Sequence, residues 1–125
     1  MVEQKIIESI NLVTALDTEG IGPSFAVWFY YSDSGSWKFL MAGNSIDKLL
    51  NQEQNQAYLK LVNTMAKLDL MYLESYDIKL IRTDDKLLAL RSMISTGSKG
   101  ISRIHCSKNY LNGIFIEDAV ILRAA

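Results

Sequence analysis

Arg103, His105 and Glu117 are the residues of this chain whose types could act together in chemistry. Arginine can anchor a phosphate or a carboxylate through its fork of N–H donors, and histidine can accept or release a proton near neutral pH. Glutamate can orient such a histidine, so the three residues on one sheet face would form a small site for an anionic substrate. The alternative interpretation is a cross-strand ion pair beside a hydrogen-bonded histidine on a partly solvated face, which is the commoner arrangement.

Whether these residues share a face depends on the register of the last two strands of the chain. A two-residue turn at Asn112-Gly113 would put the isoleucines of the final strand on the same face as Arg103 and His105. Matching the apolar side chains instead requires a register shifted by one residue. We therefore expect an odd-length loop near residues 108–110, or a bulge at Gly113.

The remaining candidates give no catalytic or metal-binding pattern. His105 and Cys106 are adjacent in a strand, so their side chains point to opposite faces and cannot form a nucleophile and base pair. One histidine and one cysteine are too few for a usual zinc site, and we expect neither a metal nor a cofactor. Residues 95–100 lack P-loop spacing and follow a predicted helix, which indicates a helix stop and a linker. Asp118 falls among isoleucines, which predicts a bulge or a buried acid with a partner.

The stretch from Phe25 to Tyr31 is the one around which the other elements must pack, because all seven of its residues are apolar or aromatic. It is too short for an ordinary helix and rich in strand formers, which predicts a strand buried on both faces. Small polar residues around Gly35 follow, and the apolar pattern resumes from Trp37 to Ala42, which predicts a hairpin. Tyr31 and Trp37 flank the hairpin loop and are the candidates for a surface that binds another protein or a second copy of the chain.

Hydrophobic periodicity supplies the elements that must cover this hairpin. It predicts a helix over residues 2–16 with a left-handed stop at Gly20, a helix over about 53–68, and a helix with its N-cap at Thr83 and its stop at Gly97. It also predicts strands over 76–81 and twice between 101 and 123. Residues 45–51 are ambiguous and could form a separate helical turn. The order helix, two strands, helix, strand, helix, two strands predicts an α+β fold. We expect a single domain over residues 1–125, with one largely antiparallel mixed sheet of about five strands packed with three helices.

Composition narrows the classes of function. The formal net charge is −1 and no run of like charge occurs, which argues against nucleic-acid binding. No apolar stretch approaches the roughly 20 residues of a membrane-spanning helix. A single cysteine and a start interrupted by acids favour a cytoplasmic protein.

The end of the chain, from Asn112 to Arg123, combines Asn-Gly, Ile-Glu-Asp-Ala and a final arginine. This ending resembles that of a group of small uncharacterised bacterial proteins. The resemblance covers only this part of the chain and implies a bacterial source, with no activity attached to it.

These observations favour a small protein-interaction or ligand-binding module over an enzyme, because no recognised catalytic grouping is present. The aromatic strand surface also exceeds what one layer of helices would cover, so a homodimer through the hairpin is one expectation. The alternative, from another class, is a small hydrolase or transferase that acts on an anionic substrate at Arg103, His105 and Glu117.

Overall fold

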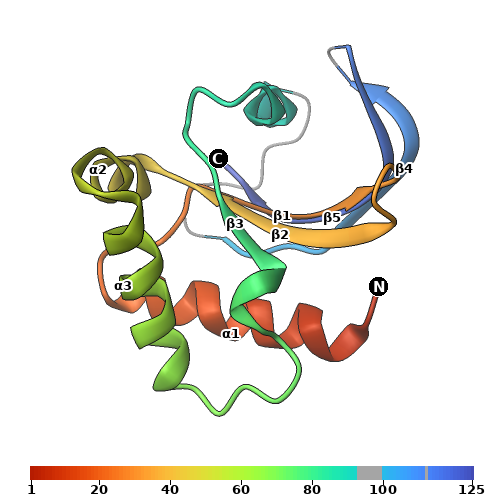
Figure 1. Ribbon diagram of the computed structural model, residues 1–125. Helices are drawn as coiled ribbons and strands as arrows, with labels where there is room; N and C mark the ends of the chain where they lie inside the picture. The colour runs from red at the N-terminus through yellow and green to blue at the C-terminus, as the bar shows by residue number, and fades with distance from the viewer. Residues whose placement is uncertain (93–99, 112) are drawn as a thin grey trace.

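The structure is a computed structural model that describes residues 1–92, 100–111 and 113–125 (Figure 1). These residues form one five-stranded sheet in the order β3-β2-β1-β5-β4. Strands β2 and β3 are parallel, and the other neighbours are antiparallel. The strands are β1 (Phe25–Tyr31), β2 (Ser36–Ala42), β3 (Ile78–Leu80), β4 (Ile104–Leu111) and β5 (Ile114–Ala124). The predicted α+β class and the single mixed sheet are confirmed.

The helical elements follow the predicted order but differ from it in detail. They are α1 (Glu3–Thr18), α2 (Asn44–Gln52), α3 (Gln54–Ala66) and two 3₁₀ helices, η1 (Ser75–Asp77) and η2 (Lys86–Ser92). The ambiguous segment 45–51 belongs to a separate helix, α2, which ends where the backbone of Glu53 becomes extended. The third predicted helix is the shorter 3₁₀ helix η2, and its predicted stop at Gly97 lies outside the described residues.

The predicted N-cap at Thr83 is wrong, because its side chain has another partner. The Thr83 hydroxyl and backbone N–H both donate to the carboxylate of Asp47 in α2. At the start of η2, the carboxylate of Asp85 accepts a 2.9 Å hydrogen bond from the backbone N–H of Leu87. Asp85 therefore supplies the acceptor that the sequence assigned to Thr83.

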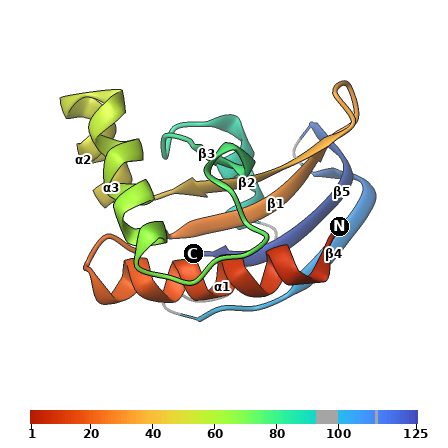
Figure 2. The same ribbon diagram turned by 60° about the horizontal axis from the view of Figure 1, so that its bottom comes forward.

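Helices cover both faces of the sheet (Figures 1 and 2). Helix α1 packs on one face, here called the α1 face, and η2 packs on the other, here called the η2 face. Residues Phe25 to Trp28 of β1 have no exposed surface, so the prediction that this strand is buried on both faces is confirmed. The core of the α1 face includes Leu12, Val13, Ala26, Trp28, Phe39, Met41, Leu61 and Leu122. The core of the η2 face includes Phe25, Val27, Phe29, Leu40, Leu88, Leu90, Ile116 and Ile121.

Trp28 is the central side chain of the α1 face. Its ring stacks on Phe39 of β2 with a centroid distance of 5.1 Å. Its indole N–H donates a 2.9 Å hydrogen bond to the hydroxyl of Ser9 in α1, and both residues are fully buried. The polar atom of the indole is thus satisfied, and the bond fixes the rotation of α1 over the sheet.

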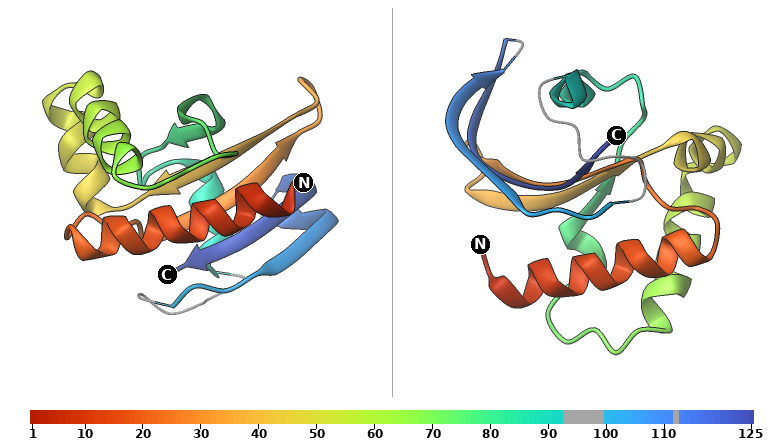
Figure 3. Two further views of the ribbon diagram at one scale, coloured as in Figure 1. Left: turned by 90° about the horizontal axis from the view of Figure 1, so that it is seen from below. Right: turned by 180° about the vertical axis from the view of Figure 1, so that it is seen from behind.

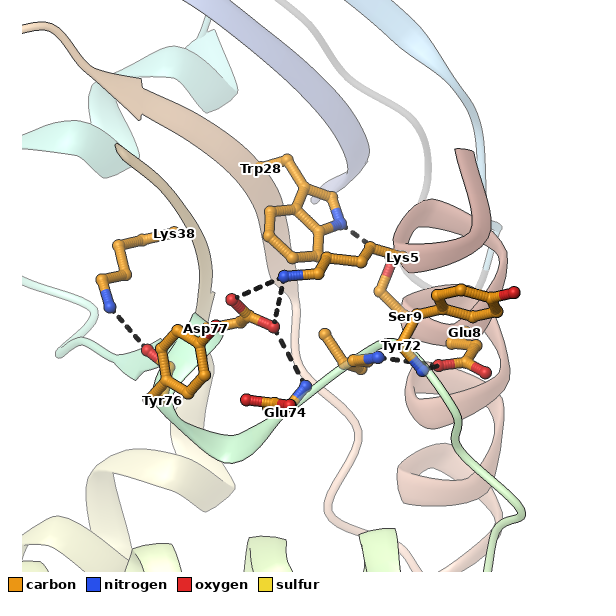
Figure 4. Close-up of polar contacts among 10 residues, drawn as sticks. Lys5, Glu8, Ser9, Trp28, Lys38, Tyr72, Glu74, Tyr76 and Asp77 are labelled. Atoms are coloured by element: carbon orange, nitrogen blue, oxygen red, sulfur yellow. Dashed lines mark hydrogen bonds and ion pairs between the residues drawn. The ribbon is translucent and has the colours of Figure 1, made fainter. Parts of the chain in front are cut away.

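Polar contacts tie α1 to the segment that leads into β3 (Figure 4). The Glu8 carboxylate accepts hydrogen bonds from the backbone N–H groups of residues 71, 72 and 73, each 2.8 Å long. The Lys5 ammonium lies 3.0 Å from the carboxylate of Asp77, which also accepts from the backbone N–H of Glu74. These charges are used to hold irregular backbone against the helix.

The β4–β5 hairpin has the register that the sequence analysis rejected. Leu111 pairs with Ile114, so only residues 112 and 113 separate the strands, and Cys106 pairs with Ala119 in the same register. The expected odd-length loop and shifted register are therefore wrong. Lys108 explains the difference, because its φ of 47° interrupts the alternation of the strand.

The interruption moves apolar side chains to one face. Ile104 and Cys106 before Lys108, and Leu111 after it, all pack on the core of the η2 face, although Leu111 has the opposite parity. The strand pair curls as it passes this point, and Figure 3 shows the hairpin rising from the sheet. The apolar match is thus achieved by changing faces within the strand, with no change of register.

Candidate functional site

Arg103, His105 and Glu117 do not meet in the structure. The Arg103 guanidinium forms two hydrogen bonds of 2.7 Å with the carboxylate of Glu3 at the start of α1. The His105 ring contacts the carboxylate of Asp118 on the neighbouring strand. Glu117 lines a cleft on the η2 face, away from the other two residues.

Arg103 and His105 therefore fit the alternative interpretation, an ion pair beside a hydrogen-bonded histidine on a partly solvated face. Each belongs to an exposed pair with a carboxylate, but the partners are Glu3 and Asp118 and not Glu117. The hydrogen bond and the charge of Arg103 lower the pKa of the Glu3 carboxyl, as expected of a bidentate pair. The site for an anionic substrate would need all three side chains together, and the sheet separates them.

Tyr31 and Trp37, the candidates for a partner surface, also lie on different faces. Trp37 packs against Tyr30 with a centroid distance of 5.4 Å and adjoins the core of the α1 face. Tyr31 packs against Phe29 at 5.0 Å and adjoins the core of the η2 face. Both are half-buried, so they do not form one exposed aromatic patch.

A cleft with a volume of about 780 Å³ opens on the η2 face, and we call it the Tyr31 cleft. Its walls are η2, the end of the β1–β2 hairpin and the start of β5. The β4–β5 hairpin curls, and the curl brings the start of β5 up beside η2 (Figures 1 and 3). Its apolar lining comes from Phe29, Tyr31, Leu87, Ile114 and Phe115, and its charged lining from Asp33, Lys79, Asp85, Lys86 and Glu117.

The charges of the Tyr31 cleft differ in depth. Asp85 and Glu117 are half-buried, whereas Asp33, Lys79 and Lys86 are exposed. Burial raises the pKa of the Tyr31 hydroxyl, and the negative charge of Asp85 raises it further. At neutral pH this hydroxyl is therefore protonated and is a hydrogen-bond donor to anything in the cleft.

Two contacts of aromatic rings lie in or beside the cleft. The Lys79 ammonium lies 5.9 Å from the centroid of the Tyr31 ring, within the range of a cation–π interaction. The rings of Tyr110 and Phe115 lie 5.0 Å apart at the end of the β4–β5 hairpin, where Phe115 reaches the cleft. The cleft thus offers aromatic rings beside charged groups.

Comparison with family models, curated proteins and solved structures finds no match. The functional proposal therefore rests on the geometry of the cleft.

Of the two half-buried carboxylates in this cleft, Glu117 is the one that has no partner in the protein among the described residues. In the described part of the chain it makes no hydrogen bond and no ion pair, although it is half-buried. The carboxylates at the contact between α1 and the segment that leads into β3 differ in this respect, because Glu8 and Asp77 each accept at least two hydrogen bonds (Figure 4). A half-buried carboxylate with no protein partner is the group that a ligand can use.

The described residues contain no group of three or more His, Cys, Asp or Glu side chains that could hold a metal ion. Within the same residues, no helix has the length and apolar character needed to cross a bilayer.

The sequence alone does not predict this cleft, although Tyr31 and Glu117 are both candidate site residues. Asp85 and Lys86 lie in the segment predicted as the third helix, and nothing in the local pattern there indicates a binding site. The alternation of side chains along a strand could have placed Glu117. It lies two residues from Ala119 and four from Ile121, which both face the η2 core, so its side chain is expected on the same face. The two-residue turn would have shown that Glu117 and His105 diverge.

Proposed function

We propose that this protein is a small ligand-binding module, not an enzyme, and that the Tyr31 cleft is its binding site. One observation carries the proposal: the cleft has the volume of a small-molecule site and combines an aromatic and aliphatic lining with a few polar groups. The half-buried Glu117 and the protonated Tyr31 hydroxyl supply an acceptor and a donor that could orient a ligand.

A panel of phenyl compounds that differ in charge tests this proposal. Phenethylamine, 2-phenylethanol and 3-phenylpropionate are each titrated into the isotope-labelled protein, and the amide resonances are followed by NMR. At least one compound should shift the resonances of β1 and β5 residues around Tyr31 and Glu117 in a saturable way.

Two tryptophan variants make the test specific to the cleft. Ala89 lines the cleft, so Ala89→Trp should fill it and remove the response. Asn11 is exposed on α1, so Asn11→Trp adds the same side chain elsewhere and should leave the response unchanged. If all three compounds leave the cleft resonances unmoved, the proposed function is wrong.

A second candidate function is self-association, which one observation favours. β4 is an outer strand of the sheet, and its hairpin exposes 72% of Tyr110 and 43% of Phe115. Such an edge can pair with the same edge of a second copy. We place a homodimer here and not at the β1–β2 hairpin, because both of those strands lie inside the sheet with neighbours on each side.

Light scattering on the purified chain tests the dimer. Tyr110→Pro in β4 should convert dimer to monomer, because the N–H of this position faces the open edge and proline removes it without a loss of hydrogen bonds to β5. A monomer in the unmodified protein would overturn this candidate. We also propose a cytoplasmic location, supported by the one free cysteine, and a bacterial source, supported by the C-terminal resemblance.

A further inference from the structure

The geometry of the Tyr31 cleft points to a ligand class: a small organic cation, with an amine or alkylammonium group on an apolar or aromatic body. This inference rests on the proposed function and adds the charge of the ligand to it.

The depth of the charges is the first reason. The two half-buried charged residues, Asp85 and Glu117, are both carboxylates, whereas both lysines of the lining are exposed. Charges withdrawn from water act more strongly on a ligand than exposed charges, which solvent and salt screen. The interior of the cleft therefore favours a positive group, and the longer lysine side chains can move toward solvent.

The state of the two carboxylates is the second reason. One Asp85 oxygen already accepts the Leu87 N–H bond at 2.9 Å, so this carboxylate is partly used by the protein. Glu117 has no such bond among the described residues and keeps its acceptor capacity for a ligand. An ammonium group is a donor only, with three N–H bonds, and is the complement of an acceptor-only carboxylate.

The aromatic lining is the third reason. The faces of aromatic rings attract cations, and a carboxylate beside such rings is a usual way to hold an ammonium group. Lys79 shows that the Tyr31 ring accepts one, because its own ammonium lies 5.9 Å from the ring centroid. The Lys79 ammonium thus holds the position that the ligand cation takes on binding.

Three probes that share a phenyl group and differ in charge decide the ligand class. By NMR titration at neutral pH, phenethylamine should bind about tenfold more tightly than the neutral 2-phenylethanol, since a cation–π contact and a carboxylate partner are added. The anion 3-phenylpropionate should bind more weakly than either. Added salt should weaken only the binding of phenethylamine.

Adjacent residues provide a matched pair of variants. Glu117→Gln should weaken phenethylamine binding about tenfold and leave 2-phenylethanol unaffected, because it removes the charge and keeps the shape. Asp118→Asn makes the same change one residue away, on the carboxylate that contacts His105, and should leave phenethylamine binding unchanged.

Lys79→Met supplies a readout of opposite sign. Removing the competing ammonium should tighten phenethylamine binding, whereas a cleft that binds anions through Lys79 would lose affinity for 3-phenylpropionate. Tightest binding of 3-phenylpropionate, or equal effects of the Glu117 and Asp118 variants, would overturn the cation inference while the cleft remained a binding site. Failure of all three probes would instead remove the proposed function itself.

Discussion

Glu117 and Asp118 are neighbours in the chain, yet their carboxylates serve opposite faces of the sheet. Asp118 contacts the His105 ring on the α1 side, and Glu117 lines the Tyr31 cleft on the η2 side. Alternation along a strand makes this separation unavoidable once the register is set. One carboxylate is therefore paired within the protein and the other is open to a ligand.

The bond between Trp28 and Ser9 predicts a specific loss of stability. Ser9→Ala should lower the free energy of unfolding by about 1–3 kcal/mol, because the buried indole N–H loses its acceptor. Trp28→Ala should cost roughly 3–5 kcal/mol as a core truncation. Urea unfolding would measure both. Trp28→Phe removes the donor, so adding it to Ser9→Ala should cost less than the sum of the single changes, and simple additivity would contradict the bond.

The two bidentate pairs of an arginine with a carboxylate should contribute differently to the free energy of unfolding. Arg123 is 1% exposed, and its guanidinium binds both oxygens of Asp17 at 2.9 Å. Asp17→Ala should lower the free energy of unfolding by about 3 kcal/mol, because a buried cation loses its counter-charge. Glu3→Ala breaks the exposed pair with Arg103 and should leave the urea midpoint almost unchanged. Equal losses in the two variants would contradict this assignment.

The hydrogen bonds of the Glu8 carboxylate predict how the free energy of unfolding depends on pH. Burial alone would raise its pKa, but hydrogen bonds from the N–H groups of residues 71, 73 and 72 lower the pKa below its ordinary value of 4.5. A carboxyl with a depressed pKa in the folded state stabilises the protein above its unfolded-state pKa, and this contribution is lost as the pH falls through the folded-state pKa. The stability difference between wild type and Glu8→Gln should therefore be largest near neutral pH and shrink below about pH 4.5. Urea unfolding across this range would detect it, and a constant difference would count against the Glu8 contacts.

Lys108 predicts an unusual response to substitution in a strand. Its φ of 47° is accessible to glycine without steric cost, so Lys108→Gly should preserve or raise the free energy of unfolding. Lys108→Val should lower it by about 1–2 kcal/mol, because a β-branched residue resists this conformation. Ser107→Val, at the preceding exposed strand position, is the matched control and should be tolerated. If valine is tolerated equally at both positions, the change of face at Lys108 is wrong.

Local pattern in the sequence was sufficient for the order of the main elements and for the buried strand. Seven apolar residues from Phe25 to Tyr31 can only be satisfied by cover on both faces, and the structure provides it. Gly20 was expected as a left-handed stop, and its φ is 78°. Such features depend on a few residues that are neighbours in the sequence, so they can be predicted from the sequence alone.

The Tyr31 cleft depends on contacts between residues that are far apart in the sequence, which a local pattern cannot predict. The two-residue turn set the register of the β4–β5 hairpin and so decided that Glu117 points away from His105, whereas the positive φ of Lys108 let the apolar side chains beyond it pack on the η2 face. The curl of that hairpin then brought Ile114 and Phe115 up beside η2 and made a cleft with Tyr31. The sequence by itself determined which segments are strands and which are buried, because burial follows from side-chain type and period. Only the tertiary structure decided which polar groups share a face, because a single change of backbone conformation exchanges every side chain beyond it.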